Sequence, residues 1–136
     1  NNEITTDLTD FKDYKSVSQY AEDAVKWAVA NKIILGIPLY TRLWKENGSE
    51  VTSIVVAMKN EDKYIKSETT WLESAQQKYV EYTDKNVTYK MWIEDEDSIR
   101  QKLNLIKKYN LTGAAFWQKG FEKDDIWQIV KSQIME

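Results

Sequence analysis

Two short runs of apolar and small residues constrain the fold of this chain more than any other feature. They are IILGIPL, residues 33–39, and LTGAAFW, residues 111–117. A continuous apolar run of this length is typical of a strand that is buried on both faces, as in a parallel sheet covered by helices. Pro38 has no N–H for a ladder, so it should lie near the end of its strand.

Three segments with helical spacing of apolar residues surround these runs. The first begins at a capping-box pattern in residues 16–19 and should continue to about Asn31. The second opens in the acidic segment 95–98, with 98–101 as an alternative capping box. The third starts at residues 124–125. Helices that alternate with buried strands predict an α/β fold with parallel strands.

Residues 45–93 have a different character. The sequence predicts a turn-rich link, a short helix and two antiparallel strands joined by a turn at 83–86; these elements cover residues 45–50, 58–66, 77–82 and 87–93. The last of these segments alternates apolar with other residues, which is the period of a half-covered hairpin. This part of the chain therefore predicts a small α+β insertion between the two buried strands.

Composition excludes several kinds of chemistry. The chain has 136 residues, no His and no Cys, so it lacks Ser-His and Cys-His nucleophiles, Cys/His zinc sites and disulfides. Its net charge of −3, with basic and acidic residues interleaved, argues against a nucleic-acid partner. No apolar run approaches the length of a membrane span. We expect neither a metal nor a cofactor. The six Trp and eight Tyr suit partly wet ligand surfaces as well as cores.

Three segments together resemble the C-terminal third of family 18 glycoside hydrolases, and most closely their bacterial spore-cortex and cell-wall branch. The segments are KIILGIPLYTRLW (32–44), YKMWIEDEDSIRQKLNLIKKYNLTGAAFWQKGFE (89–122) and DIWQIV (125–130). Members of that branch act on N-acetylglucosamine-containing glycans. The resemblance covers most of the chain, from about Val17 to Val130.

The resemblance implies the C-terminal portion of a TIM (β/α)8 barrel. Residues 1–44 would hold a helix and barrel strand seven, and residues 45–93 the α+β insertion. Residues 94–136 would hold a helix, barrel strand eight and the final helix, so that the whole chain is one partial catalytic domain. A complete barrel takes about 250 residues.

The family's catalytic signature does not occur in this sequence. That signature is D-x-x-D-x-D-x-E, whose last Glu is the general acid, and the strand-six motif Met-x-Tyr-Asp is absent as well. We therefore assign no catalytic residue and expect this chain alone to be inactive. The acidic run 94–97 is better explained by helix capping than by paired catalytic carboxylates, since this branch resembles enzymes that use the substrate's own acetamido oxygen.

Trp117 matches the family's strand-eight Trp, which forms a flat floor beneath the sugar. An indole suits this role because the C–H face of a pyranose packs on it. The alternative is a core Trp in a buried strand.

Tyr40 and Arg42 follow strand seven at the mouth where barrel enzymes place their sites. Arg offers a rigid fork of donors for hydroxyl or acetamido oxygens. The alternative is a Tyr packed under the insertion and an Arg paired with Glu46 or Glu50. Trp44 would either extend the groove or wedge the insertion in place.

The function that the resemblance implies is that of a glycosidase segment for chitin or peptidoglycan, which supplies groove residues but not the acid. The alternative is a non-catalytic module that binds cell-wall glycan or serves a structural or interaction role. Expected partners are the glycan, the rest of the barrel and, for this chain alone, a second copy that covers the exposed strands. The family suggests an extracellular, cell-wall or spore-associated location.

Overall fold

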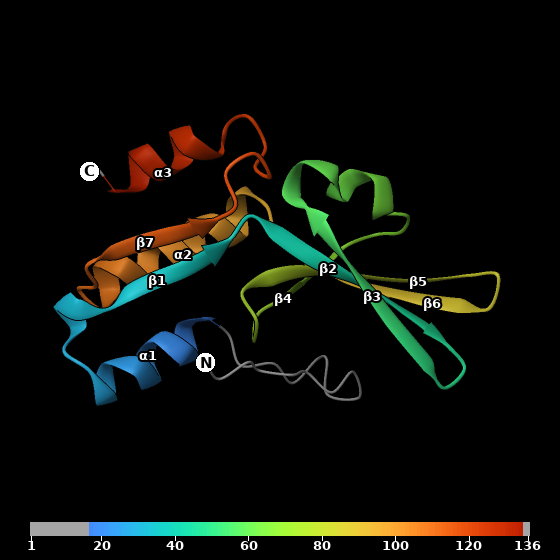
Figure 1. The fold of residues 1–136 in the computed structure, drawn as a ribbon, viewed down its shortest axis with the longest axis horizontal. Coiled ribbons are helices and arrows are strands. Elements are labelled where there is room, and N and C mark those ends of the chain that lie inside the picture. The colour runs from blue at the N-terminus through green and yellow to red at the C-terminus, as the bar shows by residue number, and fades with distance from the viewer. Residues whose placement is uncertain (1–16, 135–136) are drawn as a thin grey trace.

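The computed structural model describes residues 17–134, which form an α/β structure with two sheets (Figure 1). The smaller sheet pairs β1 (Ile34–Pro38) with β7 (Gly113–Trp117) in parallel. Ile34 lies opposite Gly113, and Pro38 lies opposite Trp117. Both predicted strands are therefore confirmed, and Pro38 ends its strand as expected.

Helices cover one face of this two-stranded sheet. They are α2 (Glu96–Lys108) and α3 (Ile126–Ile134), while α1 (Val17–Trp27) lies beside α2. The core between strands and helices is built from fully or largely buried side chains: Ile37, Leu39, Met58, Ile99, Leu103, Ile126 and Ile129. The first helix ends earlier than predicted and is followed by a short 3₁₀ helix, η2 (Ala30–Lys32). Ser16 of its predicted capping box lies outside the described residues.

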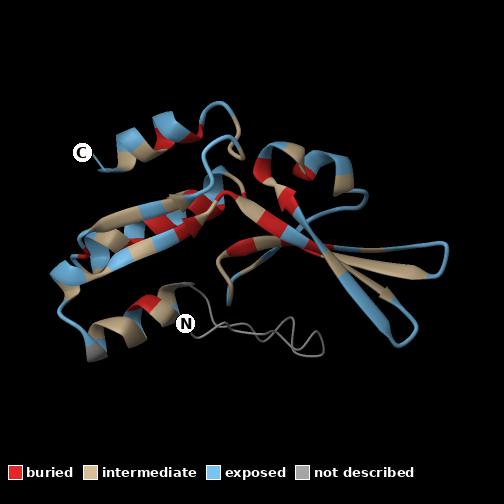
Figure 2. Cartoon of the chain, in the orientation of Figure 1, coloured by how far each residue is buried: buried red, intermediate tan, exposed pale blue. Residues whose placement is uncertain are grey.

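The two strands are not buried on both faces in this chain, contrary to the sequence prediction. Ile34 is 61% exposed and Trp117 is 66% exposed, and Gly36 and Ala115 on the same face are exposed as well (Figure 2). The opposite face holds Ile37 at 1% exposure. The apolar run is thus covered by helices on one side only.

The second helix begins one turn earlier than the alternative capping box would place it. Asp95 is the N-cap residue: its Oδ1 accepts from the backbone N–H of Ser98 at 3.1 Å. In return, Ser98 Oγ accepts from the backbone N–H of Asp95 at 2.9 Å. Ser98 therefore completes the box from within the helix and does not start it.

The larger sheet has five antiparallel strands in the order β3-β2-β6-β5-β4. Its elements are β2 (Tyr40–Asn47), β3 (Glu50–Ala57), the 3₁₀ helix η3 (Met58–Tyr64), β4 (Thr70–Leu72), β5 (Gln77–Asp84) and β6 (Val87–Ile93). The predicted β5–β6 hairpin is confirmed, and Lys85 and Asn86 at its turn both have positive φ. Residues 40–44, expected before the insertion, form the start of β2 in this sheet.

The larger sheet has its own core. Leu43, Val56, Val80, Met91 and Ile93 are buried together, and Tyr64 and Ile65 pack against them from η3 and the residue after it. None of the helices in residues 17–134 is long and apolar enough to cross a membrane.

The two sheets meet at Leu39, where β1 passes into β2 (Figure 1). The Leu39 N–H donates to the carbonyl oxygen of Trp117 at 2.7 Å, and its own carbonyl accepts from the N–H of Met58 at 3.0 Å. Leu39 is fully buried. One residue thus links the end of β7 to the start of η3.

Candidate functional site

Burial alternates without interruption along residues 34–44, from β1 into β2. The odd-numbered residues, such as Ile37, Leu39 and Leu43, are the more buried at every step. The even-numbered ones, which include Tyr40, Arg42 and Trp44, are half-buried or exposed. Since successive side chains in a strand point to opposite faces, the three predicted site residues of this segment share one face.

The less buried side of the neighbouring two-stranded sheet, which adjoins β2 at Leu39, holds the end of β7. Trp117 pairs with Pro38, and residues that pair across neighbouring strands lie on the same side of a sheet. We call this surface the open face; it comprises Ile34, Gly36, Pro38, Tyr40, Arg42, Trp44, Gly113, Ala115 and Trp117. All four residues predicted to bind a ligand lie on it.

Trp117 is an exposed indole at the end of its strand, so the described residues do not bury it as a core side chain. The turn that follows, after a cis peptide bond to Gln118, is held by Glu122. The carboxylate of Glu122 accepts from the Gly120 N–H at 2.7 Å and from Trp127 Nε1 at 2.9 Å. A bond from its own backbone N–H and, to a smaller extent, the bonds from Trp127 and Gly120 lower the pKa of Glu122, so it remains an acceptor at neutral pH.

Arg42 donates from Nη1 to Ser53 Oγ on β3 at 3.1 Å, and its side chain is exposed. Glu46, one of its expected salt-bridge partners, instead pairs with Lys90 at 2.8 Å. Among residues 17–134, Ser53 is the one hydrogen-bond partner of the Arg42 side chain, which leaves most of its five N–H donors for another group.

Tyr40 and Trp44 are half-buried and lie two residues on either side of Arg42. Tyr40 pairs with Ala57, and Trp44 lies between Ser53 on β3 and Lys90 on β6. Both side chains thus remain partly accessible to solvent. A flat indole, a phenol and a guanidinium on one face can pack on the C–H surface of a polar ring and hydrogen-bond its substituents.

A buried polar cluster lies away from this face, and sequence reasoning missed it. Glu94 accepts from Lys102 Nζ in a short contact, from Gln77 Nε2 at 2.9 Å and from Ser98 Oγ at 2.8 Å. All of these side chains are buried. Glu94 was expected to help cap α2; it is instead the centre of a network that ties β5 to α2.

Glu61 on η3 adjoins this cluster and is fully buried. Its Oε1 accepts from the backbone N–H of Glu94 at 2.9 Å, while its Oε2 has no hydrogen-bond partner among the described residues. Burial is the main cause that raises the pKa of Glu61 to about 9, so the group is neutral at pH 7. A raised carboxyl pKa is typical of a general acid, but a fully buried Glu cannot reach a substrate. We interpret the cluster as structural.

Within residues 17–134, no group of three or more His, Cys, Asp or Glu side chains is arranged to hold a metal ion. The usable chemistry of the open face is therefore that of its aromatic rings, its guanidinium and its backbone.

Comparison with known proteins identifies the class as glycoside hydrolase. The sequence profile of the glycosyl hydrolases family 18 matches residues 3–122. The chain therefore belongs to glycosyl hydrolase family 18.

Its relatives include the cortical fragment-lytic enzyme of Bacillus subtilis, which is 30% identical over 126 residues that span 82% of this chain and 28% of the relative. The glycosylase YvbX of the same organism is 26% identical, over 86% of this chain and 34% of the relative. The chain thus spans about a third or less of the length of the curated relatives it matches.

Solved structures give the same result for the fold. The spore cortex-lytic enzyme SleL of Bacillus megaterium superposes with a TM-score of 0.68 at 29% identity, covering 86% of this chain and 29% of SleL. A chitinase from Chromobacterium violaceum superposes with a TM-score of 0.72 at 22% identity, covering 85% of this chain and 37% of the chitinase. The second likeness concerns the fold alone.

Proposed function

We propose that this chain forms one side of the glycan-binding groove of a glycoside hydrolase that acts on N-acetylglucosamine-containing glycans, of the chitin or spore-cortex peptidoglycan class. The observation that carries the proposal is the open face, which presents Trp117, Tyr40, Arg42 and Trp44 together. Membership of family 18 and the likeness to cortex-lytic relatives support the substrate class.

In the whole protein, β1 and β7 would be strands seven and eight of a (β/α)8 barrel. The five-stranded sheet would be the insertion between strand seven and its helix. The exposure of Ile34 supports this arrangement, since the inner face of a barrel strand is covered by the other strands. Trp117 lies at the end of its strand, where a barrel opens to its ligand. The remaining strands would then be the main partner of this chain.

Each residue of the open face has a distinct role in this proposal. Trp117 is the floor on which the C–H face of a sugar ring packs. Arg42 donates to hydroxyl or acetamido oxygens, and Tyr40 adds a hydroxyl and an aromatic edge. Trp44, further along β2, extends the groove to a neighbouring sugar.

Hydrolysis needs a general acid from outside these residues. No D-x-x-D-x-D-x-E string occurs in the sequence, and the buried positions of Glu61 and Glu94 keep them from a substrate. We therefore expect this chain to bind glycan without cleaving it.

The test measures binding and turnover of a soluble N-acetylglucosamine tetramer by the 136-residue chain. Trp117→Ala should weaken binding by at least about tenfold, which corresponds to about 1.4 kcal/mol. Ile134→Ala, which shortens an exposed apolar side chain on α3 outside the open face, is the control and should bind as the parent does. Robust hydrolysis by the parent chain, or unchanged binding by Trp117→Ala, would contradict the proposal.

A second candidate function is glycan binding without hydrolysis in the whole protein. Human YKL-39, whose fold matches with a TM-score of 0.70 at 19% identity, is described as a pseudo-chitinase with retained chitooligosaccharide binding properties. The same fold thus accommodates binding alone. A D-x-x-D-x-D-x-E string in the rest of the protein, together with turnover of the tetramer, would favour the hydrolase; a substituted final Glu would favour the binder.

A further inference from the structure

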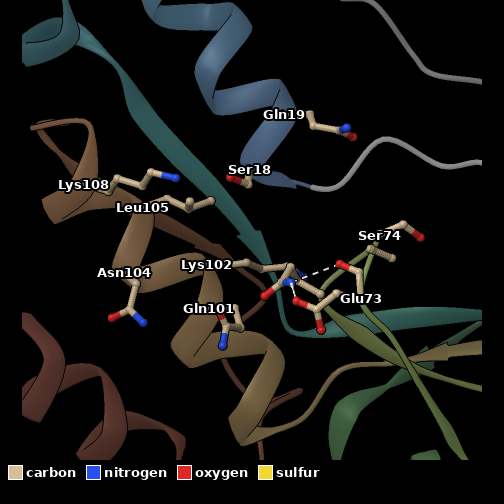
Figure 3. A pocket seen from close by; sticks show the side chains of 11 residues that line it. Ser18, Gln19, Glu73, Ser74, Gln101, Lys102, Asn104, Leu105 and Lys108 are labelled. Carbon is tan, nitrogen blue, oxygen red and sulfur yellow. Dashed lines mark hydrogen bonds between the residues drawn. The ribbon is translucent and has the colours of Figure 1, made fainter.

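A polar cavity lies between α1, α2 and the turn at residues 73–76 that joins β4 to β5 (Figure 3). Its volume is about 480 Å³, which is within the range of small-molecule sites, roughly 300–1,000 Å³. None of its lining residues belongs to the open face. The cavity is therefore a separate candidate for ligand binding.

The α2 side of the cavity is a stripe of exposed polar side chains. Gln101, Asn104 and Lys108 are spaced three and four residues apart, so they lie on one side of the helix. Ser18 and Gln19 line the cavity from α1 (Figure 3). Amides and hydroxyls both donate and accept hydrogen bonds, as the hydroxyl groups of a sugar do.

Glu73 forms the opposite side, and neighbours hold its carboxylate in place. Its Oε2 accepts from Trp71 Nε1 at 2.9 Å, and its Oε1 accepts from Gln76 Nε2 at 2.7 Å. These two bonds lower the pKa of Glu73, so the group is an anion at neutral pH. A carboxylate has about four acceptor positions, which leaves positions on both oxygens for adjacent hydroxyl groups of a ligand.

The charges around the cavity nearly cancel. Lys102 is neutralised by its buried pair with Glu94, which leaves Glu73 and Lys108 as one charge of each sign. A cavity lined by one negative and one positive side chain favours a neutral polar ligand over a phosphate or a nucleotide. The indole of Trp71, bonded to Glu73 and 37% exposed, adds a flat apolar surface beside the site.

We propose that this cavity binds a neutral saccharide unit and serves as a second glycan-binding site of the protein. The proposal rests on the proposed function, because it takes the second ligand to be another part of the same polymer. Two sites on one chain raise the effective concentration of the polymer at the groove, which helps an enzyme that works on an insoluble substrate.

The test is an NMR titration of the 136-residue chain with the N-acetylglucosamine tetramer. We expect two groups of saturable amide shifts, one in residues 40–44 and 113–117 and the other in residues 73–76 and 101–108. Glu73→Ala and, separately, Gln101→Ala should weaken the second group by at least about tenfold and leave the first unchanged. Gln128→Ala, an exposed amide on α3, is the matched control.

Trp117→Ala separates the two proposals, since it should remove the first group of shifts and keep the second. Shifts confined to the open face would overturn the second site and leave the proposed function standing. Cavity shifts that survive both Glu73→Ala and Gln101→Ala would also overturn this assignment. The use of two variants from different elements guards against a local change in the 73–76 turn.

Discussion

The two sheets of this chain differ in how completely they bury their apolar residues. The five-stranded sheet closes its own core, with Leu43, Val80 and Met91 at 1% exposure or less. The two-stranded sheet covers one face with helices and exposes Ile34 and Trp117 on the other. A segment with a complete core behaves as a folding unit, whereas a half-covered sheet needs further strands. The difference indicates which part of the chain would gain most from additional strands.

The largest expected effect comes from breaking the buried ion pair between Lys102 and Glu94, which links the two regions. Lys102→Met should lower the free energy of unfolding by about 3–5 kcal/mol, because it leaves the buried Glu94 carboxylate without its cation. Urea denaturation followed by circular dichroism measures this loss. Lys131→Met, an exposed change on α3, should stay within about 0.5 kcal/mol of the parent. Equal stabilities for the two variants would show that the cluster does not join the regions.

A second pair of variants compares the two sheets directly. Leu43→Ala removes a buried side chain from the core of the larger sheet and should cost about 2–5 kcal/mol. Ile34→Ala removes an exposed side chain of similar size and should cost less than about 0.5 kcal/mol in this chain. Thermal unfolding of both proteins gives the comparison. The comparison is made at a concentration at which the chain is monomeric, and a large loss for Ile34→Ala there would mean that this side of β1 is covered within one chain.

Glu61 provides a pH-dependent test of the same junction. Its pKa is about 9 in the folded chain, against an ordinary value of 4.5. Between these values the folded state binds one more proton than the unfolded state, so the free energy of unfolding falls as pH rises from about 4.5 to about 9.

Glu61→Gln should remove that part of the slope and raise the unfolding free energy at pH 8 by about 1–3 kcal/mol. Denaturation curves at about pH 5, 7 and 9 check this change in slope. Glu68→Gln, at an exposed position, should retain the slope of the parent. A Glu61→Gln variant that keeps the slope would show that another group causes it.

The smallest expected effect concerns self-association. We expect two copies of this chain to pair around the exposed Ile34, along the edges of β1 and β7 that have no partner strand among the described residues. Ile34 lies at the opposite end of these strands from Trp117, so this pairing leaves the predicted glycan-binding residues accessible. Ile34→Glu should raise the dissociation constant about tenfold in sedimentation velocity. Val29→Glu, which places a charge at another exposed apolar position, should leave it unchanged. A parent chain that sediments as a monomer at all concentrations would contradict this expectation.

Sequence patterns predicted the two-stranded sheet and its helices better than the five-stranded sheet. Continuous apolar runs and helical spacing are local signals, and they located β1, β7, α2 and α3. The β2–β3 hairpin was missed. Its β3 strand is an edge strand with exposed Val51, Ile54 and Val55, so no clean alternation marks it. The Asn47-Gly48 pair at its turn, where Gly48 has positive φ, was the available signal.

Recognition of β2 as a strand would also have placed the candidate residues on a common face. Tyr40, Arg42 and Trp44 alternate with buried Thr41 and Leu43, and period two would have predicted this. The buried cluster had no comparable signal. Glu94 and Lys102 are eight residues apart, and only the packing of β5 and η3 against α2 removes Glu94 from water.

Leu39 determines how rigidly the two sides of the proposed groove are joined. A segment that is joined to its domain by a flexible linker can move away from a binding site and close over it again. Here the polypeptide passes from one sheet to the other within a single residue, Leu39, which is hydrogen-bonded to Trp117 on one side and to Met58 on the other. A rotation of the five-stranded sheet relative to β7 would therefore strain the hydrogen bonds of Leu39. We therefore expect the proposed groove to keep nearly the same width with and without its ligand.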